Sequence, residues 1–462
     1  LRPAAVLFFG VAAFGLALSP DHATASAPAI VTGGTSHSCA VLPAGVFCWG
    51  SNAGRQLGDG TSTDRPAAVA VASLGRNVRS IASSANHSCA VTNSGEALCW
   101  GNDVSGELGA GPDAMGTSNT PIEVAGLSNV EQVATGARHS CARTAGGTVY
   151  CWGWNGLGQV SPGAQEIQRT PVEVAGLGRD IVSVAAADFQ NCAVTANGGV
   201  RCWGADVTPE AVGTAVVDWL DADGELFTDA VSIESGIRHT CVLRANATAS
   251  CWGNNASGQL GNGSRGGTLT PVVVQTPDRE PLTGIAAISL GGDLSCALLG
   301  DRSVMCWGEN EHGQLGDGTT SDRTTATGVV GLSRGVVAAG AGRNHACAVL
   351  LSGEVRCWGM NTLGQVGAET NEDCGSAVFM FHCSRTPLPV EGIATAPAAI
   401  AGDADCDGSA TSRDATLVLQ FGAKLLGTLR CLASADADGN GGVAAPDAAL
   451  ILQSVAGLTE LG

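Results

Sequence analysis

The stretch RHSCARTAGGTVYCWGWNGLGQV, residues 138–160, contains two cysteines ten residues apart and a Trp-Gly pair directly after the second. If Cys141 and Cys151 face each other across an antiparallel hairpin, the residues between them leave a three-residue loop that ends at Gly147. Such loops favour glycine in the last position, because that residue adopts a left-handed conformation. Directly opposed strand residues lie roughly 4.5–5.5 Å apart, within disulfide range. The spacing therefore predicts a hairpin with its own disulfide, and the tryptophan that follows packs on the opposite face.

The same pattern occurs seven times, and successive Cys-Trp-Gly triplets are 49 to 55 residues apart. Glycine recurs at the end of the loop in several copies, whereas the fifth and sixth copies carry Ala247 and Arg302 there. Structural zinc sites take cysteines in pairs separated by two to four residues, and the sequence has no such pair, so disulfides are preferred over zinc. The expected bridges are Cys39–Cys48, Cys89–Cys99, Cys141–Cys151, Cys192–Cys202, Cys241–Cys251, Cys296–Cys306 and Cys347–Cys357, with Cys374–Cys383 and Cys406–Cys431 as two further pairs.

Each triplet is followed by an Asn, a GQLGDG-like segment, a Pro with alternating valines, and a strand of the VEQVATG kind. Four short strands per copy and no helical pattern between copies predict a mainly-β fold, a seven-bladed β-propeller over residues 28–394. The seventh copy ends at residues 388–394 without a strand of the VEQVATG kind. We therefore expect Ile30 and Val31, just before the first copy, to pair into the seventh blade and close the ring.

The repeat GxxHSCAV, CWG-N-xxxGQLGDG and P-V-V resembles the regulator-of-chromosome-condensation-type repeat in its bacterial, secreted form, over residues 30–394. The resemblance implies a seven-bladed propeller. One member of that family is a nucleotide-exchange factor for a small nuclear GTPase and binds nucleosomes. Neither activity is transferred here, because a shared fold does not carry function.

The N-terminus and the charge bear on location. Arg2, the apolar run 4–18 and the small residues 23–27 are typical of a signal peptide, expected to span residues 1–27. A membrane anchor is the alternative, but the run is about fifteen residues and a spanning helix needs roughly 20. An even count of 18 cysteines favours an oxidising compartment. A net charge of −19 argues against nucleic-acid binding. We expect a secreted, extracellular or cell-surface protein that is not an integral membrane protein.

Two copies depart from the repeat and five histidines recur within it. Residues 206–229 replace the GQLG half of the fourth copy, and residues 369–386 include an insert in the seventh. These are either recognition loops or loop drift. A histidine precedes the first cysteine by two residues in five copies, but Gln190 and Leu294 take its place elsewhere, so packing is preferred over a metal ring. The GxSxG match at 331–335 is a repeat linker.

After the linker 395–401, residues 402–462 contain two stretches that align at an offset of 33, residues 403–420 and 436–453. Each fits a twelve-residue calcium loop, with oxygen ligands at fixed positions and glycine at the sixth. A helix is expected after each loop, with Leu417, Leu419, Leu450 and Leu452 in the core. The expected ligands are Asp403, Asp405, Asp407, Ser409, Thr411 and Asp414 for one ion, and Asp436, Asp438, Asn440, Gly442 and Asp447 for the second.

An EF-hand has Glu at position 12 of the loop, whereas both loops here have Asp. With Asp at this position the segment resembles a type I dockerin, a small α-helical domain with a double calcium loop. The resemblance implies two calcium ions and docking onto a cohesin-like domain. The positions that usually contact the cohesin, often Ser-Thr, are Ser412-Arg413 and Ala445-Pro446 here.

Two functions fit these features. The first is a secreted, non-catalytic binding or scaffold protein, whose propeller presents a face to a protein or a cell-surface glycan and whose dockerin-like segment tethers it. The alternative is a component or accessory enzyme of an extracellular polysaccharide-degrading assembly. No catalytic constellation stands out from the repeat. A cleft with converging Asp and Glu side chains would favour the enzyme.

Overall fold

A computed structural model describes residues 29–113, 116–205, 215–370, 372–374, 381–393, 412–422, 448–449 and 451–452. The chain divides into two units, one covering Ala27–Ala398 and the other Leu1–Ser26 with Ala399–Gly462. The predicted signal peptide lies outside the described residues. No helix in the described ranges is both long enough and apolar enough to cross a membrane.

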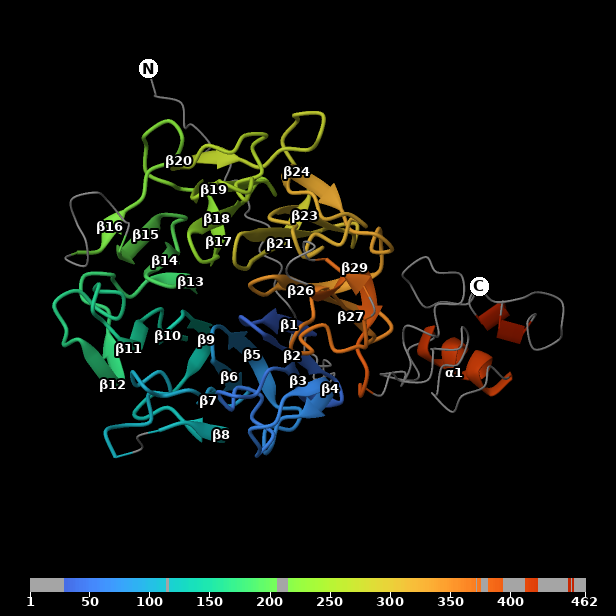
Figure 1. Cartoon of the computed structure of the whole chain (residues 1–462), viewed down its shortest axis with the longest axis horizontal. Helices are drawn as coiled ribbons and strands as arrows, with labels where there is room; N and C mark the ends of the chain where they lie inside the picture. Colours follow the sequence, from blue (N-terminus) through green and yellow to red (C-terminus); the bar gives the residue numbers. More distant parts are fainter. Residues whose placement is uncertain are drawn as a thin grey trace, which may run out of the picture. The chain divides into compact units, whose positions relative to one another are not determined.

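The first unit consists of seven antiparallel sheets arranged around a centre (Figure 1), which confirms the predicted mainly-β, seven-bladed propeller. Blades 1 to 4 contain β1 (Ile30–Gly33), β2 (His37–Leu42), β3 (Gly45–Gly50), β4 (Arg65–Ala70); β5 (Val78–Ser83), β6 (His87–Thr92), β7 (Ala97–Gly101), β8 (Ser118–Glu123); β9 (Val130–Thr135), β10 (His139–Thr144), β11 (Val149–Trp154), β12 (Ile167–Glu173); and β13 (Ile181–Ala186), β14 (Gln190–Thr195), β15 (Val200–Gly204), β16 (Val217–Asp218). Blades 5 to 7 contain β17 (Ala230–Ser235), β18 (His239–Arg244), β19 (Ala249–Gly253), β20 (Thr268–Val273); β21 (Ile285–Leu290), β22 (Leu294–Leu299), β23 (Val304–Gly308), β24 (Arg323–Gly328); and β25 (Val336–Ala341), β26 (His345–Leu350), β27 (Val355–Met360), β28 (Glu372–Asp373), β29 (His382–Pro389).

The expected ring closure is wrong. β1 pairs with β2 inside blade 1, with Ile30 opposite Val41, and the outer positions of blade 7 are taken by β29 and β28. Every blade is thus built from consecutive sequence. Blades 7 and 1 meet through hydrogen bonds from the amide of Arg343 to the carbonyl of Gly34 (3.0 Å) and from the amide of Ala68 to the carbonyl of Glu391 (2.8 Å). An apolar cluster that includes Val31, Trp49, Val366 and Ile393 covers this junction.

The hairpins have the predicted register. Cys141 lies opposite Cys151, and Gly147 at the end of the loop has a φ of 74°. Ala247 and Arg302, at the same position in blades 5 and 6, also adopt positive φ values, of 59° and 66°. The loop geometry is therefore kept where glycine is not. Each of the seven in-blade cysteine pairs expected from the spacing forms a disulfide, as does Cys374–Cys383. The Cys406–Cys431 pair lies outside the described residues.

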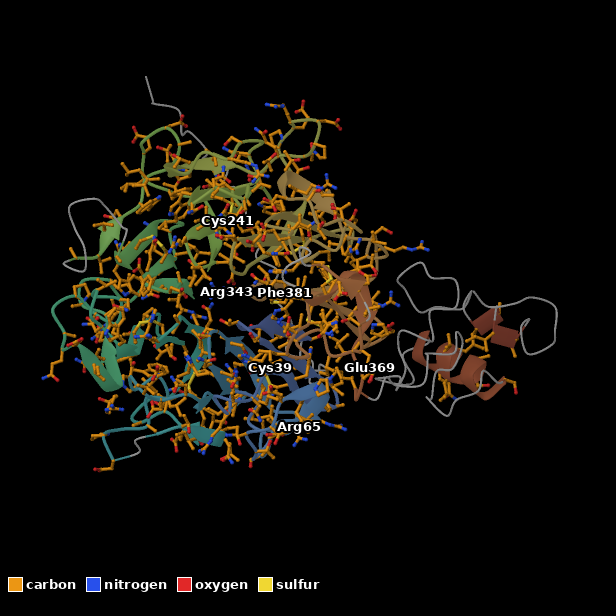
Figure 2. The ribbon with its side chains drawn as sticks, viewed as in Figure 1. Cys39, Arg65, Cys241, Arg343, Glu369 and Phe381 are labelled. Carbon is orange, nitrogen blue, oxygen red and sulfur yellow. A yellow bond between two sulfur atoms is a disulfide. The ribbon has the colours of Figure 1, made fainter. Side chains whose placement is uncertain are left out.

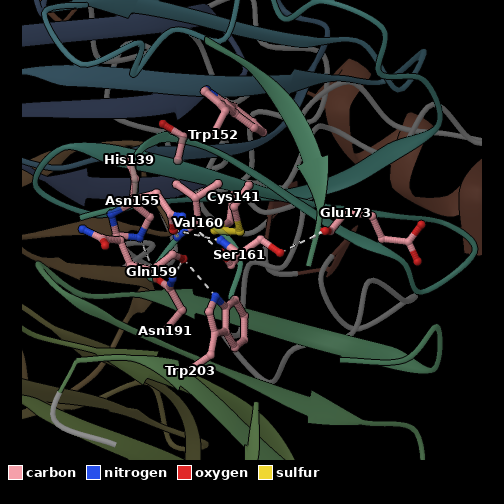
Figure 3. Close-up of a disulfide and its surroundings, with 12 residues drawn as sticks. His139, Cys141, Trp152, Asn155, Gln159, Val160, Ser161, Glu173, Asn191 and Trp203 are labelled. Atoms are coloured by element: carbon pink, nitrogen blue, oxygen red, sulfur yellow. Dashed lines mark hydrogen bonds between the residues drawn. A yellow bond between two sulfur atoms is a disulfide. The ribbon is translucent and has the colours of Figure 1, made fainter. Parts of the chain in front are cut away.

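The Cys-Trp-Gly tryptophan forms a hydrogen-bonded latch to the preceding blade. Between blades 3 and 4 the indole Nε1 of Trp203 donates to the carbonyl of Gln159 at 2.9 Å, and Asn191 Nδ2 donates to the same carbonyl at 2.5 Å (Figure 3). His139 Nε2 then reaches Asn191 Oδ1 at 2.7 Å. Four other junctions use a serine in place of Asn191, namely Ser38, Ser88, Ser140 and Ser295. The tryptophan-to-carbonyl pairs are Trp49–Gln365, Trp100–Gln56, Trp152–Glu107, Trp203–Gln159, Trp307–Gln259 and Trp358–Gln314.

The junction of blades 4 and 5 has no such latch among the described residues. Blade 4 has lost the GQLG segment that would supply the carbonyl, and Trp252 Nε1, in a side chain only 2% exposed, has no described acceptor. Trp219 stacks on Trp252 instead, with ring centroids 5.4 Å apart, and Phe227 packs beside it. Aromatic contact thus replaces a hydrogen bond at this one junction.

The second unit contains α1 (Ser412–Gly422) and a few further helical residues, 448–449 and 451–452. The buried side chains among its described residues are Ala415, Val418, Ala448 and Ile451, which repeat at the offset of 33. Leu419 and Leu452 are 47% and 45% exposed, so their expected place in a core is wrong. Leu417 is half-buried, and Leu450 lies outside the described residues.

Candidate binding face

The loops between the first and second strands of the blades surround the central channel at one end. We call them the mouth loops; they are residues 34–36, 84–86, 136–138, 187–189, 236–238, 291–293 and 342–344. They line a cavity of about 180 Å³, and the inner strands line a channel segment of about 280 Å³ behind it. Ligand pockets for drug-sized molecules hold roughly 300–1,000 Å³. The channel mouth therefore suits water or a single inserted group of a partner.

Backbone hydrogen bonds join the mouth loops of blades 5, 6, 7, 1 and 2 into an open arc. The amide of Thr35 donates to Ser84 O (3.0 Å), and the amide of Gly292 donates to Gly342 O (3.3 Å). The backbones approach so closely that a Cβ on Gly291 would lie 1.8 Å from the carbonyl oxygen of Gly342. Glycine is required there for that reason. Within the described residues, the mouth loops of blades 3 and 4, the second of which carries Asp188, make no backbone bond to a neighbouring mouth loop.

Charged side chains occupy the mouth loops of only some blades. The position two residues before the repeat histidine holds Asp188 in blade 4 and Arg343 in blade 7, and Arg343 lies near the middle of the propeller (Figure 2). The neighbouring loop position holds Arg138 in blade 3, Arg238 in blade 5 and Asp293 in blade 6. Burial raises the pKa of Asp188, while the guanidinium groups of Arg343 and Arg238 act in the opposite direction. The mouth loops thus carry two half-buried carboxylates, Asp188 and Asp293, and three exposed cations, Arg138, Arg238 and Arg343.

Glu234 lies deeper in the channel, on β17. It is the only ionisable side chain among the described residues that line the 280 Å³ segment. Burial raises its pKa to about 7. Because Asp188 and Glu234 come from blades 4 and 5, the acidic side of the channel is the side next to the unlatched junction.

The carboxylates nearer the rim are held by the propeller's own side chains. Burial, followed by the charges of Asp293 and Glu311, raises the pKa of Glu309 to about 7, and Gln314 Nε2 donates to Glu309 at 3.0 Å. Gln259 Nε2 donates to Asp293 at 2.7 Å. Burial likewise raises the pKa of Glu107 to about 6. These groups can bind a polar partner, but their contacts tie them to the blade junctions.

The repeat histidines belong to the latches. Ser88 Oγ donates its proton to the carbonyl oxygen of Gln56 at 3.2 Å. His37 Nε2 lies 2.9 Å from Ser88 Oγ, so this nitrogen must carry a hydrogen and donate it to the hydroxyl. The same reasoning fixes the neutral Nε2–H tautomer of His139 against Asn191. Burial lowers the pKa of the five histidines to about 3 or 4. No cluster of three or more possible metal-binding side chains occurs in the described part of the chain, and the hydrogen bonds agree with the packing interpretation.

The calcium ligands predicted from the sequence do not belong to the channel mouth. Asp403, Asp405, Asp407, Ser409, Thr411, Asp436, Asp438, Asn440, Gly442 and Asp447, the expected calcium ligands apart from Asp414, are outside the described residues. Asp414 lies in α1. The charged mouth residues Asp188, Glu234 and Arg343 were missed. Their signal was present as departures from the repeat at aligned positions, where other blades carry Thr, Ala, Ile, Ser or Gly.

The two irregular segments are partly described. In the seventh blade, β28 pairs with β29, the Cys374–Cys383 disulfide joins the insert to β29, and Phe381 packs edge-on against His312 with centroids 5.3 Å apart. In the fourth blade, residues 206–214 are outside the described residues, and residues 215–229 contain β16 and a hairpin that directs Trp219 inwards.

Comparison with protein families gives two matching profiles, both described as the regulator of chromosome condensation (RCC1) repeat. One matches residues 44–91, 94–143, 146–194, 251–298 and 303–349, more than half of the chain. The other matches residues 78–107, 130–159, 230–259, 285–314 and 336–365.

The chain is similar to several curated proteins. It is 30% identical over 358 residues to the ultraviolet-B receptor UVR8 of Arabidopsis thaliana, covering 74% of this chain and 79% of that protein. It is 28% identical over 349 residues to the human E3 ubiquitin-protein ligase HERC2, but spans only 6% of its length. Among solved structures, Prp20p of Saccharomyces cerevisiae, studied for its binding to Gsp1p and histones, has a TM-score of 0.64 at 21% identity and covers 80% of this chain and 88% of that one.

Proposed function

The chain belongs to the RCC1-repeat family, and from that premise we propose that it is an exported bacterial, non-catalytic binding protein whose propeller presents the channel-mouth face to a protein partner. One observation carries the proposal. Residues that repeat in the blades build the latches and hairpins, whereas the charged residues Asp188, Arg238 and Arg343 vary between blades and gather at one end of the channel. A position that is free to vary in a repeat protein is free to recognise a partner.

The likeness to Prp20p supports the fold, and the binding of Gsp1p and histones belongs to that protein. The net charge of −19 makes nucleic acid an unsuitable partner here. A partner that inserts a charged side chain into the mouth would meet both signs of charge, which favours a protein segment over a neutral glycan. The alternative function in a polysaccharide-degrading assembly is kept only as a role without catalysis. The two rim carboxylates, Asp293 and Glu309, accept hydrogen bonds from Gln259 and Gln314.

A recovery experiment tests the face. Full-length chain is immobilised and exposed to the culture medium and cell-surface fraction of the source organism. The wild type and the control Arg179→Ala, an exposed arginine on a connection between blades, should recover the same protein. The double variant Asp188→Ala/Arg343→Ala should lose it. Equal recovery by the double variant would contradict the assignment of the face.

We further propose that residues 402–462 bind two calcium ions and tether the protein to a cohesin-like domain, and that residues 1–27 direct its export. The support is the sequence alone: two loops with four and three carboxylates at calcium-ligand positions. Calorimetric titration of the full chain should give two sites. Asp403→Ala should remove the tighter site and Asp436→Ala the weaker one. A chain that takes up no calcium would contradict the proposal, and the proposed tether with it.

A further inference from the structure

The outer edge of blade 4 differs from the other blade edges. Its outer strand β16 is two residues long, whereas β4, β8, β20 and β24 have six. The chain then forms a small hairpin in which Leu220 bridges Leu226 and the amide of Asp221 donates to the carbonyl of Glu225 at 2.7 Å. We call residues 217–226 the blade-4 hairpin. Because successive side chains of a strand alternate in direction, Trp219 points inwards onto Trp252 and Leu220 points outwards.

An apolar groove lies between the blade-4 hairpin and β20 of blade 5. It has a volume of about 550 Å³ and is lined by Val217, Trp219, Leu220, Leu269 and Pro271. Leu220, Leu226 and Leu269 are 46%, 57% and 48% exposed. Three large aliphatic side chains exposed together are unusual on a monomer surface and mark an interaction site. A volume of this size accepts one or two large apolar side chains.

The rim of the groove is acidic. Asp221, Asp223 and Glu225 stand on the hairpin turn and are exposed or half-buried. No described basic side chain lies within salt-bridge distance of any of the three, whereas Asp218 is paired with Arg201 at 3.0 Å. The groove therefore has an apolar floor and three carboxylates without a described basic partner, of which Asp221 also accepts hydrogen bonds at Oδ1 from the amides of Asp223 (2.9 Å) and Glu225 (3.1 Å).

We propose that this groove binds a segment of a partner protein that carries two or more Lys or Arg residues beside a large apolar side chain. The charge selects this occupant. Residues 206–214, DVTPEAVGT, contain two carboxylates and no basic residue, so the chain's own neighbouring segment does not complement the rim. A second copy of the chain, with a net charge of −19, would be repelled. The groove is separate from the channel mouth, so this site goes beyond the proposed function and stands without it.

The probe is a displayed library of random twelve-residue peptides selected on the full chain, followed by fluorescence anisotropy with one selected synthetic peptide. Selection should enrich sequences with at least two Lys or Arg residues next to Leu, Ile, Phe or Trp. The variant Leu220→Ser/Leu269→Ser should weaken binding of the selected peptide about tenfold or more. The variant Asp221→Asn/Asp223→Asn should weaken it less and flatten its salt dependence. Because all these side chains are on the surface, the variants should melt like the wild type.

Two controls define the site. Val104→Ser removes an exposed apolar side chain of blade 2, which is 74% exposed, and should leave peptide binding unchanged. Asp188→Ala/Arg343→Ala alters the channel mouth and should also leave peptide binding unchanged. The proposal for the groove and the proposal for the channel mouth can therefore fail independently of each other.

Several results would overturn the proposal: enrichment of peptides without basic residues, equal binding by the groove variants, or a dimer in sedimentation that Leu269→Ser abolishes. A fourth is a gain of about tenfold in peptide affinity when residues 206–214 are replaced by a Gly-Ser linker of equal length. That gain would make the chain's own segment the occupant.

Discussion

The junction between blades 3 and 4 and the junction between blades 4 and 5 join the same kinds of sheet in different ways. In the first, Trp203, Asn191 and His139 form a chain of hydrogen bonds that ends on one carbonyl (Figure 3). In the second, Trp252 has no described acceptor and is covered by Trp219. A buried donor without a partner costs about 1–3 kcal/mol, and aromatic stacking returns about 0.5–1.5 kcal/mol. Among the described residues, the unlatched junction therefore lacks the indole hydrogen bond that the other six junctions have, and we expect it to be less stable than the junction of blades 3 and 4.

A third arrangement occurs between blades 6 and 7. Leu294 replaces the histidine and Ala346 replaces the serine, and both are buried in one apolar cluster. The tryptophan bond is kept, since Trp358 Nε1 donates to Gln314 O at 2.9 Å. The histidine–serine pair and the Leu294–Ala346 pair thus fill the same space in two ways. Because both residues change together, neither pair leaves a buried imidazole Nε2–H or a buried hydroxyl without a hydrogen-bond partner.

Acid should produce the largest effect. The five latch histidines are neutral in the folded state, with pKa values lowered to about 3 or 4, against about 6.5 when unfolded. Their contribution to stability is fully present above pH 6.5 and is lost as the pH falls towards 4, by up to about 1.4 kcal/mol per pH unit for each histidine.

Glu234 and Glu309, with pKa values raised to about 7, and Glu107, with a pKa raised to about 6, act in the opposite direction between pH 7 and 4.5, but they are fewer and their range is shorter. Thermal melts between pH 7.5 and 4 should show a steep fall in Tm below pH 6.5. A variant with His37→Leu/Ser88→Ala should show a shallower fall. A Tm that does not change over this range would contradict the neutral latch.

Mixing the two fillings should have the next largest effect. Leu294→His places an imidazole donor against Ala346 with no acceptor, and should lower the free energy of unfolding by about 1–3 kcal/mol. Adding Ala346→Ser supplies an acceptor whose own hydroxyl can donate to Gln314 O, and should recover most of that loss. Urea unfolding measures both. If the double variant is no more stable than Leu294→His, the coupling between the two positions is absent.

Removing single indole donors should have the smallest effect. Trp100→Phe removes a hydrogen bond of 2.8 Å to Gln56 O and some ring volume, whereas Trp252→Phe removes the ring volume without any described bond. The difference between the two losses in unfolding free energy should be about 1 kcal/mol, larger for Trp100. Equal losses would mean that the latch bond contributes nothing measurable.

The hairpins, the disulfides and the count of blades could be predicted because they depend on neighbours in sequence. The pairing of Cys141 with Cys151 follows from spacing alone. The ring closure could not, since the repeat does not say where a blade begins. The strand before each first cysteine opens its own blade, as β9 pairs with β10, and Ile30 and Val31 obey the same rule.

The candidate binding face was harder to predict for a similar reason. Asp188, Glu234 and Arg343 are more than a hundred residues apart at their extremes, and only the closed ring brings them to one channel. The five histidines show the opposite case, because they stand out in sequence yet serve the junctions between blades. Prominence in a repeat indicates a structural role, and departure from the repeat indicates the variable surface.

The most direct test of the latch is hydrogen exchange at the tryptophan indoles, followed by NMR on protein labelled with ¹⁵N-tryptophan. The chain has nine tryptophans, and Trp→Phe variants assign their Nε1–H signals. The indoles of Trp49, Trp100, Trp152, Trp203, Trp307 and Trp358 donate to carbonyls and should exchange slowly. Trp252, equally buried but without a described acceptor, should exchange about tenfold faster, because its junction opens at a lower free energy. Exchange of Trp252 as slow as that of the other six would contradict the account that the latch holds the blades together.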